Sequence, residues 1–292
     1  NNNLMLDIKE EKLKSILPID GPSTEEVKKY LEKYNDEYIV IKCGGSVLID
    51  QNLFDIFIQD ISTLNKLGFT PIIIHGGGKR INNKLNEIGL ESTFIKGLRV
   101  TDDETIKVVE EVLIDFNKEI INALDQQSCK SQSINSKENN ILTVVQENEE
   151  LGFVGSPINV DQSIIDKIIA DKKMPIIAPL GLDKNDQTYN VNADTAAGYI
   201  AKKINARRLI ILSDVEGVLD KNKNLIPEIN SESIKSLIDN ETIIGGMIPK
   251  INNCLDVASN GVKGVVIIDG RKNHSLLFEL LSDEGSGTLI RQ

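Results

Sequence analysis

The sequence predicts an α/β fold, in which an open and mostly parallel sheet carries helices on both faces, giving three layers. Strand-like runs recur along the chain and are separated mainly by helical patterns, an alternation that is typical of such sheets. These runs lie at residues 38–42, 71–75, 141–145, 175–179, 208–212 and 264–268. With 292 residues, 40% of them hydrophobic, the chain can bury a full core as one large domain or as two closely packed lobes.

A helical extension precedes the first strand. Residues 4–17 have a helical pattern, and Pro18 and Pro22 break or kink the chain after it. Residues 23–26 (Ser-Thr-Glu-Glu) then form a capping-box pattern at the start of a second helix. The apolar stripe of this helix comprises Val27, Tyr30, Leu31 and Tyr34. The stripe needs a partner, which is either the chain's own α/β core or another subunit.

The first two strands end in glycine-rich turns. Residues 42–46 are Lys-Cys-Gly-Gly-Ser, and residues 75–78 are His-Gly-Gly-Gly. Glycine lets backbone N–H groups approach a ligand closely, so two such turns, one carrying a lysine, indicate a polyphosphate site. The spacing matches neither the Walker loop nor the dinucleotide fingerprint, and the alternative is a pair of ordinary strand-to-helix turns.

The segment between residues 126 and 140 is polar and has few structural signals. We therefore expect it to form a hairpin or loop on the surface. Ligands of parallel sheets bind at the carboxyl ends of the strands, which is where Lys42, His75, Ser213 and Asp269 fall.

Two asparagines and an aspartate lie close together in the second half of the chain. Asn190, Asn192 and Asp194 directly precede a helix start rich in small residues. Asp194 can cap that helix. The two asparagines lie on one side of an extended segment, where their amides can donate to a carboxylate and accept from an amide.

Two later turns add candidate ligand contacts. Ser213, Asp214 and Gly217 follow a strand, where an acidic group could accept ribose hydroxyls or a base amine; the alternative is a plain turn of Asp and Gly. Residues 245–250 are Gly-Gly-Met-Ile-Pro-Lys and place Lys250 in the first turn of a helix. The helix dipole disfavours a lysine there, so an anion bound at this helix end would account for it.

Composition excludes several classes of function. The net charge of -11 argues against nucleic acid or an anionic membrane as the main partner. Three separated cysteines and two histidines indicate neither a disulfide framework nor a zinc site. No apolar run approaches the length of a membrane span, so we expect a cytoplasmic protein, or one in an organellar stroma or matrix if a presequence was removed.

Six motifs in the expected order closely resemble the acetylglutamate kinases of the amino acid kinase family. The motifs are residues 42–46, 75–78, 97–102 (Gly-Leu-Arg-Val-Thr-Asp), 190–194, 213–218 and 245–250, and the resemblance covers about residues 38–290. It implies an amino acid kinase-like fold and an ATP-dependent kinase of the γ-carboxylate of N-acetyl-L-glutamate, in arginine biosynthesis. It further implies a helical extension at residues 1–35, an amino-acid-substrate lobe at 36–185 and a nucleotide-binding lobe at 186–292.

The resemblance also implies roles for individual residues. Lys42 and Lys250 flank the transferring phosphoryl group, and Asp194 orients both lysines. Arg99 grips the α-carboxylate of the substrate bidentately, as a lysine cannot. The remaining substrate contacts are Gly76, Gly77, Asn190 and Asn192, and the nucleotide contacts are Gly44, Gly45, Ser213, Asp214, Gly217, Met247 and Lys250. Mg²⁺ arrives with ATP, held mainly by phosphates and water, so no dedicated metal site is expected.

Two positions depart from the family pattern. After the second glycine turn the family usually has proline and an acidic or amide residue, whereas this chain has Lys79 and Arg80. Residues 136–139 (Ser-Lys-Glu-Asn) replace a glycine-rich motif of the family. The first change adds positive charge near the phosphates, and both bear on substrate choice.

The ends of the chain resemble the arginine-sensitive class of the family. That likeness implies inhibition by L-arginine bound near His274, Glu284 and Gly287, and a homo-oligomer, either a dimer or a hexamer joined through the N-terminal helices. The alternative for the glycines at 285 and 287 is a simple turn into a last strand.

Two other functions fit parts of the pattern. The chain could be a kinase of another acylated amino dicarboxylate, with a substrate pocket altered around Lys79, Arg80 and Arg99. It could also be a non-catalytic arginine-sensing subunit, although Lys42, Lys250 and Asp194 are all retained.

Overall fold

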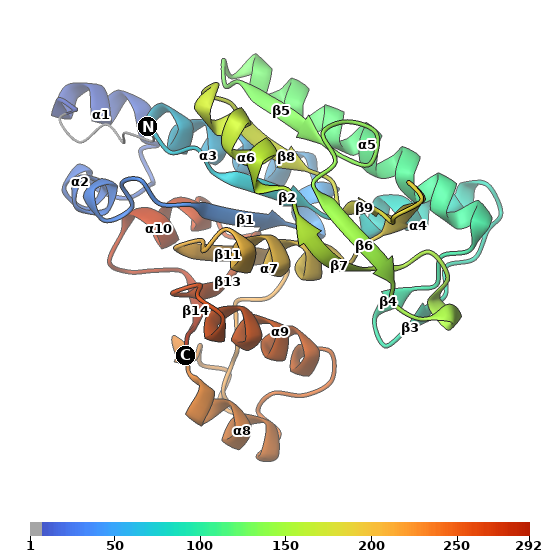
Figure 1. The fold of residues 1–292 in the computed structure, drawn as a ribbon. Coiled ribbons are helices and arrows are strands. Elements are labelled where there is room, and N and C mark those ends of the chain that lie inside the picture. The colour runs from blue at the N-terminus through green and yellow to red at the C-terminus, as the bar shows by residue number, and fades with distance from the viewer. Residues whose placement is uncertain (1–7) are drawn as a thin grey trace.

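The computed structural model describes residues 8–292 and is built around an eight-stranded sheet (Figure 1). Its strands are β1 (Ile39–Cys43), β2 (Ile72–His75), β5 (Ser131–Ile134), β8 (Met174–Ile177), β11 (Arg208–Ser213), β12 (Glu228–Ile229), β13 (Val265–Asp269) and β14 (Gly287–Ile290). The order is β12-β14-β13-β11-β1-β2-β8-β5, and all neighbours are parallel except β13 and β14. The predicted open, mostly parallel sheet is confirmed.

Helices cover both faces of this sheet, because alternate strand residues point to opposite sides. On β1, Ile39 and Ile41 belong to one buried hydrophobic cluster, whereas Val40 belongs to another. The first cluster includes residues of α3 (Gln51–Lys66), α5 (Asp103–Gln126) and α10 (Ser275–Leu281). The second includes residues of α6 (Gln162–Ala170), α7 (Ala193–Lys203), α8 (Ser231–Asp239) and α9 (Met247–Ser259). The three predicted layers are therefore present.

A second, smaller sheet stands beside the carboxyl end of the main one. It has the order β10-β9-β6-β7 and comprises β6 (Leu142–Gln146), β7 (Gly155–Val160), β9 (Leu180–Leu182) and β10 (Thr188–Asn190). The strand predicted at residues 141–145 thus exists but belongs to this sheet. The remaining short elements nearby are α4 (Gly78–Glu87), the hairpin of β3 (Phe94–Ile95) and β4 (Leu98–Arg99), and the 3₁₀ turns η1 (Gly45–Leu48) and η2 (Glu149–Leu151).

The expectation of a surface excursion at residues 126–140 is wrong in part. Residues 131–134 form β5, the edge strand of the main sheet, paired in parallel with β8. Polar residues dominate β5, and the hydroxyl group of the buried Ser133 donates a hydrogen bond to Asn117. Local sequence gives no sign of that distant partner.

The N-terminal extension packs against the chain itself. It comprises α1 (Glu10–Ile16) and α2 (Thr24–Lys33), and residues 4–7 of the predicted first helix lie outside the described part. Ser23 caps α2 by accepting a hydrogen bond from the Glu26 N–H, as predicted. Val27, Leu31 and Tyr34 are buried in the cluster that contains α10, and Figure 1 shows α2 beside α10. Within residues 8–292, no helix combines the length and the apolar character required to cross a bilayer.

Candidate active site

A cleft of about 270 Å³ opens at the carboxyl ends of β1 and β2. Its walls come from both glycine turns, the β3–β4 hairpin and the segment between β10 and α7. Of the residues predicted to bind ligands, the cleft is lined by Lys42, Gly44, Gly45, Gly76, Gly77, Arg99, Asn190 and Asn192. We call this the active-site cleft.

Asp194 joins two lysines that are far apart in the sequence. Lys42 Nζ of β1 lies 3.1 Å from Asp194 Oδ1, and Lys250 Nζ of α9 lies 2.9 Å from Oδ2. Burial opposes ionisation of the carboxyl group, but the two lysines outweigh it and hold the Asp194 pKa well below its usual range. The predicted alternative of a helix cap is wrong, because Asn192 caps α7 by accepting from the Thr195 N–H.

Charged side chains pack closely against the first glycine turn. A Cβ at position 44 would lie 2.3 Å from Lys42 Nζ, and Gly45 has a φ of +64° with the Asp214 carboxylate against it. The positive φ favours glycine at position 45, whereas at position 44 the flexible end of Lys42 can move aside for a side chain. The close approach of this turn to a ligand stays a prediction.

Of Gly76 and Gly77, the two residues of the second glycine turn predicted to bind substrate, only Gly77 has a backbone N–H left free by the described part of the chain. The Gly76 N–H donates to the Cys43 carbonyl at 2.8 Å, as part of the contact between β1 and β2. The Gly77 N–H has no acceptor among residues 8–292. Gly76 thus lines the cleft, but its N–H is already used.

Arg99 is a buried cation at the far end of the cleft. Its guanidinium group donates to Ser92 Oγ at 3.0 Å and to the Gly78 carbonyl at 3.1 Å, and it lies 4.7 Å from the centre of the Phe94 ring. In the described part of the chain, no carboxylate is within ion-pair distance of it. Burial lowers the pKa of Arg99, so an anionic ligand at this position would stabilise the charged form.

Phe94 and Ser92 are contacts of Arg99 that sequence reasoning missed. The hairpin that brings Phe94 over Arg99 turns at Lys96 and Gly97, with φ values of 49° and 81°. Two consecutive residues with positive φ are typical of a tight two-residue hairpin. A residue-glycine pair flanked by hydrophobic residues was the available signal.

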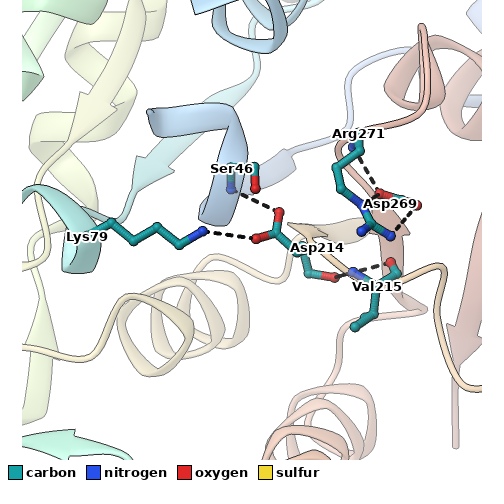
Figure 2. Close-up of polar contacts among 7 residues, drawn as sticks. Ser46, Lys79, Asp214, Val215, Asp269 and Arg271 are labelled. Atoms are coloured by element: carbon teal, nitrogen blue, oxygen red, sulfur yellow. Dashed lines mark hydrogen bonds and ion pairs between the residues drawn. The ribbon is translucent and has the colours of Figure 1, made fainter. Parts of the chain in front are cut away.

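Apart from Gly44 and Gly45, the residues predicted to bind the nucleotide are absent from the lining of the cleft. Asp214 accepts a hydrogen bond from the Ser46 N–H at 2.9 Å and pairs with Lys79 at 3.4 Å, as Figure 2 shows. Asp269, at the end of the neighbouring strand β13, forms an ion pair with Arg271. Burial opposes ionisation of Asp214, but the hydrogen bonds from Ser46 and Lys79 lower its pKa.

The three remaining residues predicted to contact the nucleotide have different local roles. Ser213 Oγ stays within its own turn, where it accepts from the Val215 N–H. Gly217 has a φ of +141° and packs against Thr288, 2.6 Å from where a Cβ would lie, which gives it a structural reason to be glycine. Met247 begins α9, the helix that carries Lys250.

The two departures from the family pattern lie at different distances from the cleft: Lys79 and Arg80 line it, and residues 136–139 do not. Lys79 is exposed and lines the cleft, next to Asp214. Arg80 also lines the cleft, but its guanidinium group binds the Leu48 carbonyl and Glu119 and stacks on Phe116, so it joins α4 to the core. Residues 136–139 are absent from the cleft lining; Ser136 donates to Glu110, which also accepts from Thr188 of β10.

A second pocket, of about 260 Å³, lies between α2, α10 and β14. We call it the α2 pocket. Its charged and polar lining includes Lys33, Arg208, Glu279, Asp283, Glu284 and the backbone of Gly285 and Gly287. Burial raises the pKa of Glu279 to about 7, with Arg208 and Lys33 opposing that rise.

His274 is outside the lining of the α2 pocket. Its ring contacts Asp60 Oδ1 at 2.6 Å and Asp20 Oδ1 at 3.1 Å, so it ties the connection between α1 and α2 to α3. The hydrogen bond with Asp60 raises the His274 pKa. The two other residues predicted for arginine, Glu284 and Gly287, do line the pocket.

No group of three or more His, Cys, Asp or Glu side chains within residues 8–292 is placed to hold a metal ion. The carboxylate of Asp194 is paired with two lysines, and their positive charges disfavour a metal ion at this position.

Comparison with known proteins gives consistent results. The model of the amino acid kinase family matches residues 37–269. An acetylglutamate kinase of Pelagibacter ubique is 67% identical over 99% of this chain and 100% of its own length. An acetylglutamate kinase of Methylobacterium nodulans is 42% identical over 90% of this chain and 91% of its own.

A solved structure has the same fold. The N-acetylglutamate synthase of Neisseria gonorrhoeae, in a complex with coenzyme A and N-acetyl-glutamate, superposes with a TM-score of 0.82 at 22% identity. The match covers 92% of this chain and 62% of the synthase chain, so this chain spans less than two thirds of that protein. The same synthase in a complex with coenzyme A and L-arginine gives a TM-score of 0.79.

Proposed function

The chain belongs to the amino acid kinase family, among its acetylglutamate kinases, and we propose that it transfers the γ-phosphoryl group of ATP to the side-chain carboxylate of N-acetyl-L-glutamate, in arginine biosynthesis. The observation that supports this most directly is the arrangement of Lys42, Asp194 and Lys250 at one end of a cleft whose other end holds the buried Arg99. Two separate positive centres suit a reaction between two anions.

Arg99 and Asn190 hold the acceptor. The guanidinium group takes the α-carboxylate of N-acetyl-L-glutamate, which supplies the anion that this buried cation lacks within the chain. Asn190 at the end of β10 and Asn192 at the start of α7 assist from the opposite wall. The side-chain carboxylate then points along the cleft towards the lysines.

The lysines stabilise the phosphoryl group during transfer. An oxygen of the acceptor carboxylate forms a bond to the γ-phosphorus, the bond to the β–γ bridging oxygen breaks, and ADP leaves. Negative charge on the transferring oxygens is met by Lys42, Lys250 and the free Gly77 N–H. Asp194 keeps the two ammonium groups apart and aimed at one place.

The acceptor requires no catalytic base. A side-chain carboxylic acid has an ordinary pKa near 4.3 and is already ionised at neutral pH, so no proton has to be removed. This fits a cleft in which the predicted catalytic groups are two cations and the carboxylate that orients them. Positioning and charge neutralisation are sufficient for the reaction.

ATP enters as its magnesium complex. Mg²⁺ retains water readily and is commonly held by phosphate oxygens, so the phosphates of ATP and bound water supply its ligands. The nucleotide extends from the lysines past Asp214 and Gly217 to the start of α9 at Met247. Residues 36–185 then act as the substrate lobe and residues 186–292 as the nucleotide lobe, with Asp194 reaching across to Lys42.

Arginine occupies the α2 pocket and inhibits the enzyme. Its guanidinium group faces the carboxylates of Glu279 and Glu284, and its own carboxylate faces Lys33 and Arg208. His274 contributes indirectly, by holding the segment before α2. The fold neighbour solved with L-arginine is consistent with such a site.

The chain works as a cytoplasmic homo-oligomer, with the N-terminal helices as one contact between subunits.

An acyl-phosphate trapping assay tests the reaction. The protein is incubated with MgATP, N-acetyl-L-glutamate and hydroxylamine, and the coloured iron hydroxamate is measured with and without arginine. Hydroxamate that depends on N-acetyl-L-glutamate supports the kinase, and its suppression by arginine supports the α2 pocket as a regulatory site. If product forms only with a longer acylated dicarboxylate, that compound is the substrate in place of N-acetyl-L-glutamate. If no acceptor gives product, the chain is a non-catalytic arginine sensor.

A further inference from the structure

A chain of buried polar side chains runs behind the second glycine turn. His75, the last residue of β2, and Asn117 of α5 are completely buried, and Ser133 of β5 is nearly so. His75 Nδ1 lies 2.8 Å from the Gly76 carbonyl oxygen, and Asn117 Nδ2 lies 3.2 Å from His75 Nε2. The proposed reaction gives none of these three side chains a role.

Their hydrogen bonds fix the position of every proton. Asn117 Nδ2 carries two hydrogens and accepts none, so it donates one to the Ile176 carbonyl and the other to His75 Nε2. Nε2 must therefore be the unprotonated ring nitrogen, which leaves the proton on Nδ1. Ser133 Oγ donates to Asn117 Oδ1 and thereby fixes the orientation of the amide. Burial lowers the pKa of His75 to about 4, so the ring is neutral at physiological pH.

The proton on Nδ1 controls the orientation of the next peptide group. The ring donates to the carbonyl oxygen of Gly76, which belongs to the peptide plane shared with Gly77. In a trans peptide the C=O and N–H bonds point in opposite directions. Since the carbonyl points at the buried ring, the Gly77 N–H points away from it, on the side where Gly77 lines the cleft.

We propose that His75 is a positioning residue for phosphoryl transfer: through the Gly76 carbonyl it aims the Gly77 N–H at the transferring group, and Asn117 and Ser133 hold the tautomer that makes this possible. The inference rests on the proposed kinase reaction. A glycine peptide without this tether is free to rotate, because glycine has little conformational preference of its own. The glycines allow the close approach of the backbone, and the buried network selects one orientation.

Two isomeric variants separate positioning from simple packing. His75→Asn places an amide N–H near the position of Nδ1, so it keeps the donor to Gly76 but loses the contact with Asn117. His75→Gln places its amide near Nε2, so it keeps the Asn117 contact and loses the donor to Gly76. Positioning predicts that kcat falls about 10²-fold in His75→Gln, the low end of the loss on deleting such a donor, and that His75→Asn retains most of the activity.

Binding and stability measurements make the comparison specific. The Kd for MgADP and the KM for N-acetyl-L-glutamate should stay near wild type in both variants, because the ADP and α-carboxylate contacts remain. Ser62→Ala is the matched control, since it removes another buried hydrogen bond, the one from Cys129, away from the cleft. It should lower Tm and leave kcat unchanged.

The contrary results are equally clear. Full kcat in His75→Gln, or equal losses in both variants that follow their Tm values, would overturn the proposal. If the His75 variants do not fold, Ser133→Ala provides the test at the far end of the network, with a smaller fall in kcat expected and an unchanged Kd for MgADP. Unchanged kcat in Ser133→Ala would then reject the role of the network. Absence of kinase activity in the wild-type chain would instead reject the proposed reaction, and a wild-type assay distinguishes the two failures.

Discussion

The active-site cleft and the α2 pocket have similar volumes, about 270 and about 260 Å³, but their charges are held in different ways. At the Lys42 end of the cleft, the side chains of Lys42, Asp194 and Lys250 are only 13%, 23% and 19% exposed. Beside the α2 pocket, the pair that ties α2 to the segment after α10 is Lys29 and Asp283, exposed by 65% and 59%.

This difference separates a rigid site from an adjustable one. Charges partly shielded from water interact strongly and keep their geometry, as a phosphoryl-transfer site requires. An exposed pair is weak and screened by salt, so the charged rim of the α2 pocket can rearrange at little cost while the apolar face of α2 stays buried. A ligand in the α2 pocket can therefore reorder the charged side chains around it, whereas a ligand in the cleft meets a preformed set of charges.

The largest effect should come from Asp194→Asn, which removes the charge between the two lysines. Their ammonium groups would then repel each other and lose their common orientation, and we expect kcat to fall about 10³-fold. The hydroxamate assay measures this loss. Asp166→Asn is the control, because Asp166 lies on α6, away from the cleft, and accepts a hydrogen bond from Tyr38. Comparable activity in Asp194→Asn and wild type would contradict the role of the charged cluster.

The second effect concerns Arg99→Lys, at the substrate end of the cleft. Lysine cannot form a bidentate contact with a carboxylate, and hydrogen bonds to charged groups contribute about 1.5–3 kcal/mol. The KM for N-acetyl-L-glutamate should rise about 10- to 100-fold, while the KM for MgATP stays the same. Arg291→Lys, an exposed arginine paired with Glu228, should change neither value. An equal rise in both KM values would show that Arg99 supports the structure of the cleft and does not bind the acceptor specifically.

How much of the cleft the sequence could predict depends on the range of the interactions. The glycine turns and Lys42 were predictable because close approach of the backbone to a ligand favours glycine, a preference that is visible in the local sequence. Asp194 was assigned a helix cap as one option, since an aspartate at a helix start has a sufficient local explanation. Asn192 took the cap, and the partners of Asp194 come from β1 and α9, which only the fold brings together.

The fold shows the same limit. Apolar strands such as β1 and β2 were recognisable because burial on both faces leaves a hydrophobic run. The polar strand β5 was missed, because the buried hydroxyl group of Ser133 is satisfied in part by Asn117, sixteen residues away in the chain. The strand near residue 142 was found but placed in the wrong sheet, since an apolar run does not specify its partners.

The third effect is a pH dependence of arginine binding in the α2 pocket. Glu279 has a pKa of about 7, above its ordinary 4.5, because burial disfavours the carboxylate. Arginine prefers the ionised form, so inhibition should strengthen by about tenfold from pH 6 to pH 8. Titration calorimetry at several pH values measures it. Glu279→Gln should bind arginine weakly and without this dependence, whereas the exposed Glu232→Gln on α8 should behave as wild type.

The same residue gives a stability test with the opposite sign. Between pH 4.5 and about 7 the folded chain keeps the proton on Glu279 that the unfolded chain has lost. The unfolded state therefore binds fewer protons, and the free energy of unfolding falls as the pH rises through this window. Above pH 7 the arginine-free Glu279→Gln variant should be more stable than wild type. Equal Tm values at pH 8 would indicate that Glu279 is not buried in solution.

The smallest effect should come from Lys29→Met, on the exposed side of the α2 pocket. The change removes an ion pair with Asp283 at 2.8 Å, and because both side chains are exposed to water the Tm should fall only slightly. Arginine inhibition should weaken a few-fold, and less so at high salt, because the pair is already screened there. Lys28→Met is the control, since Lys28 is exposed and makes no ion pair within residues 8–292. A large loss of kcat in Lys29→Met would show that α2 supports the cleft directly and that the two pockets are not built independently.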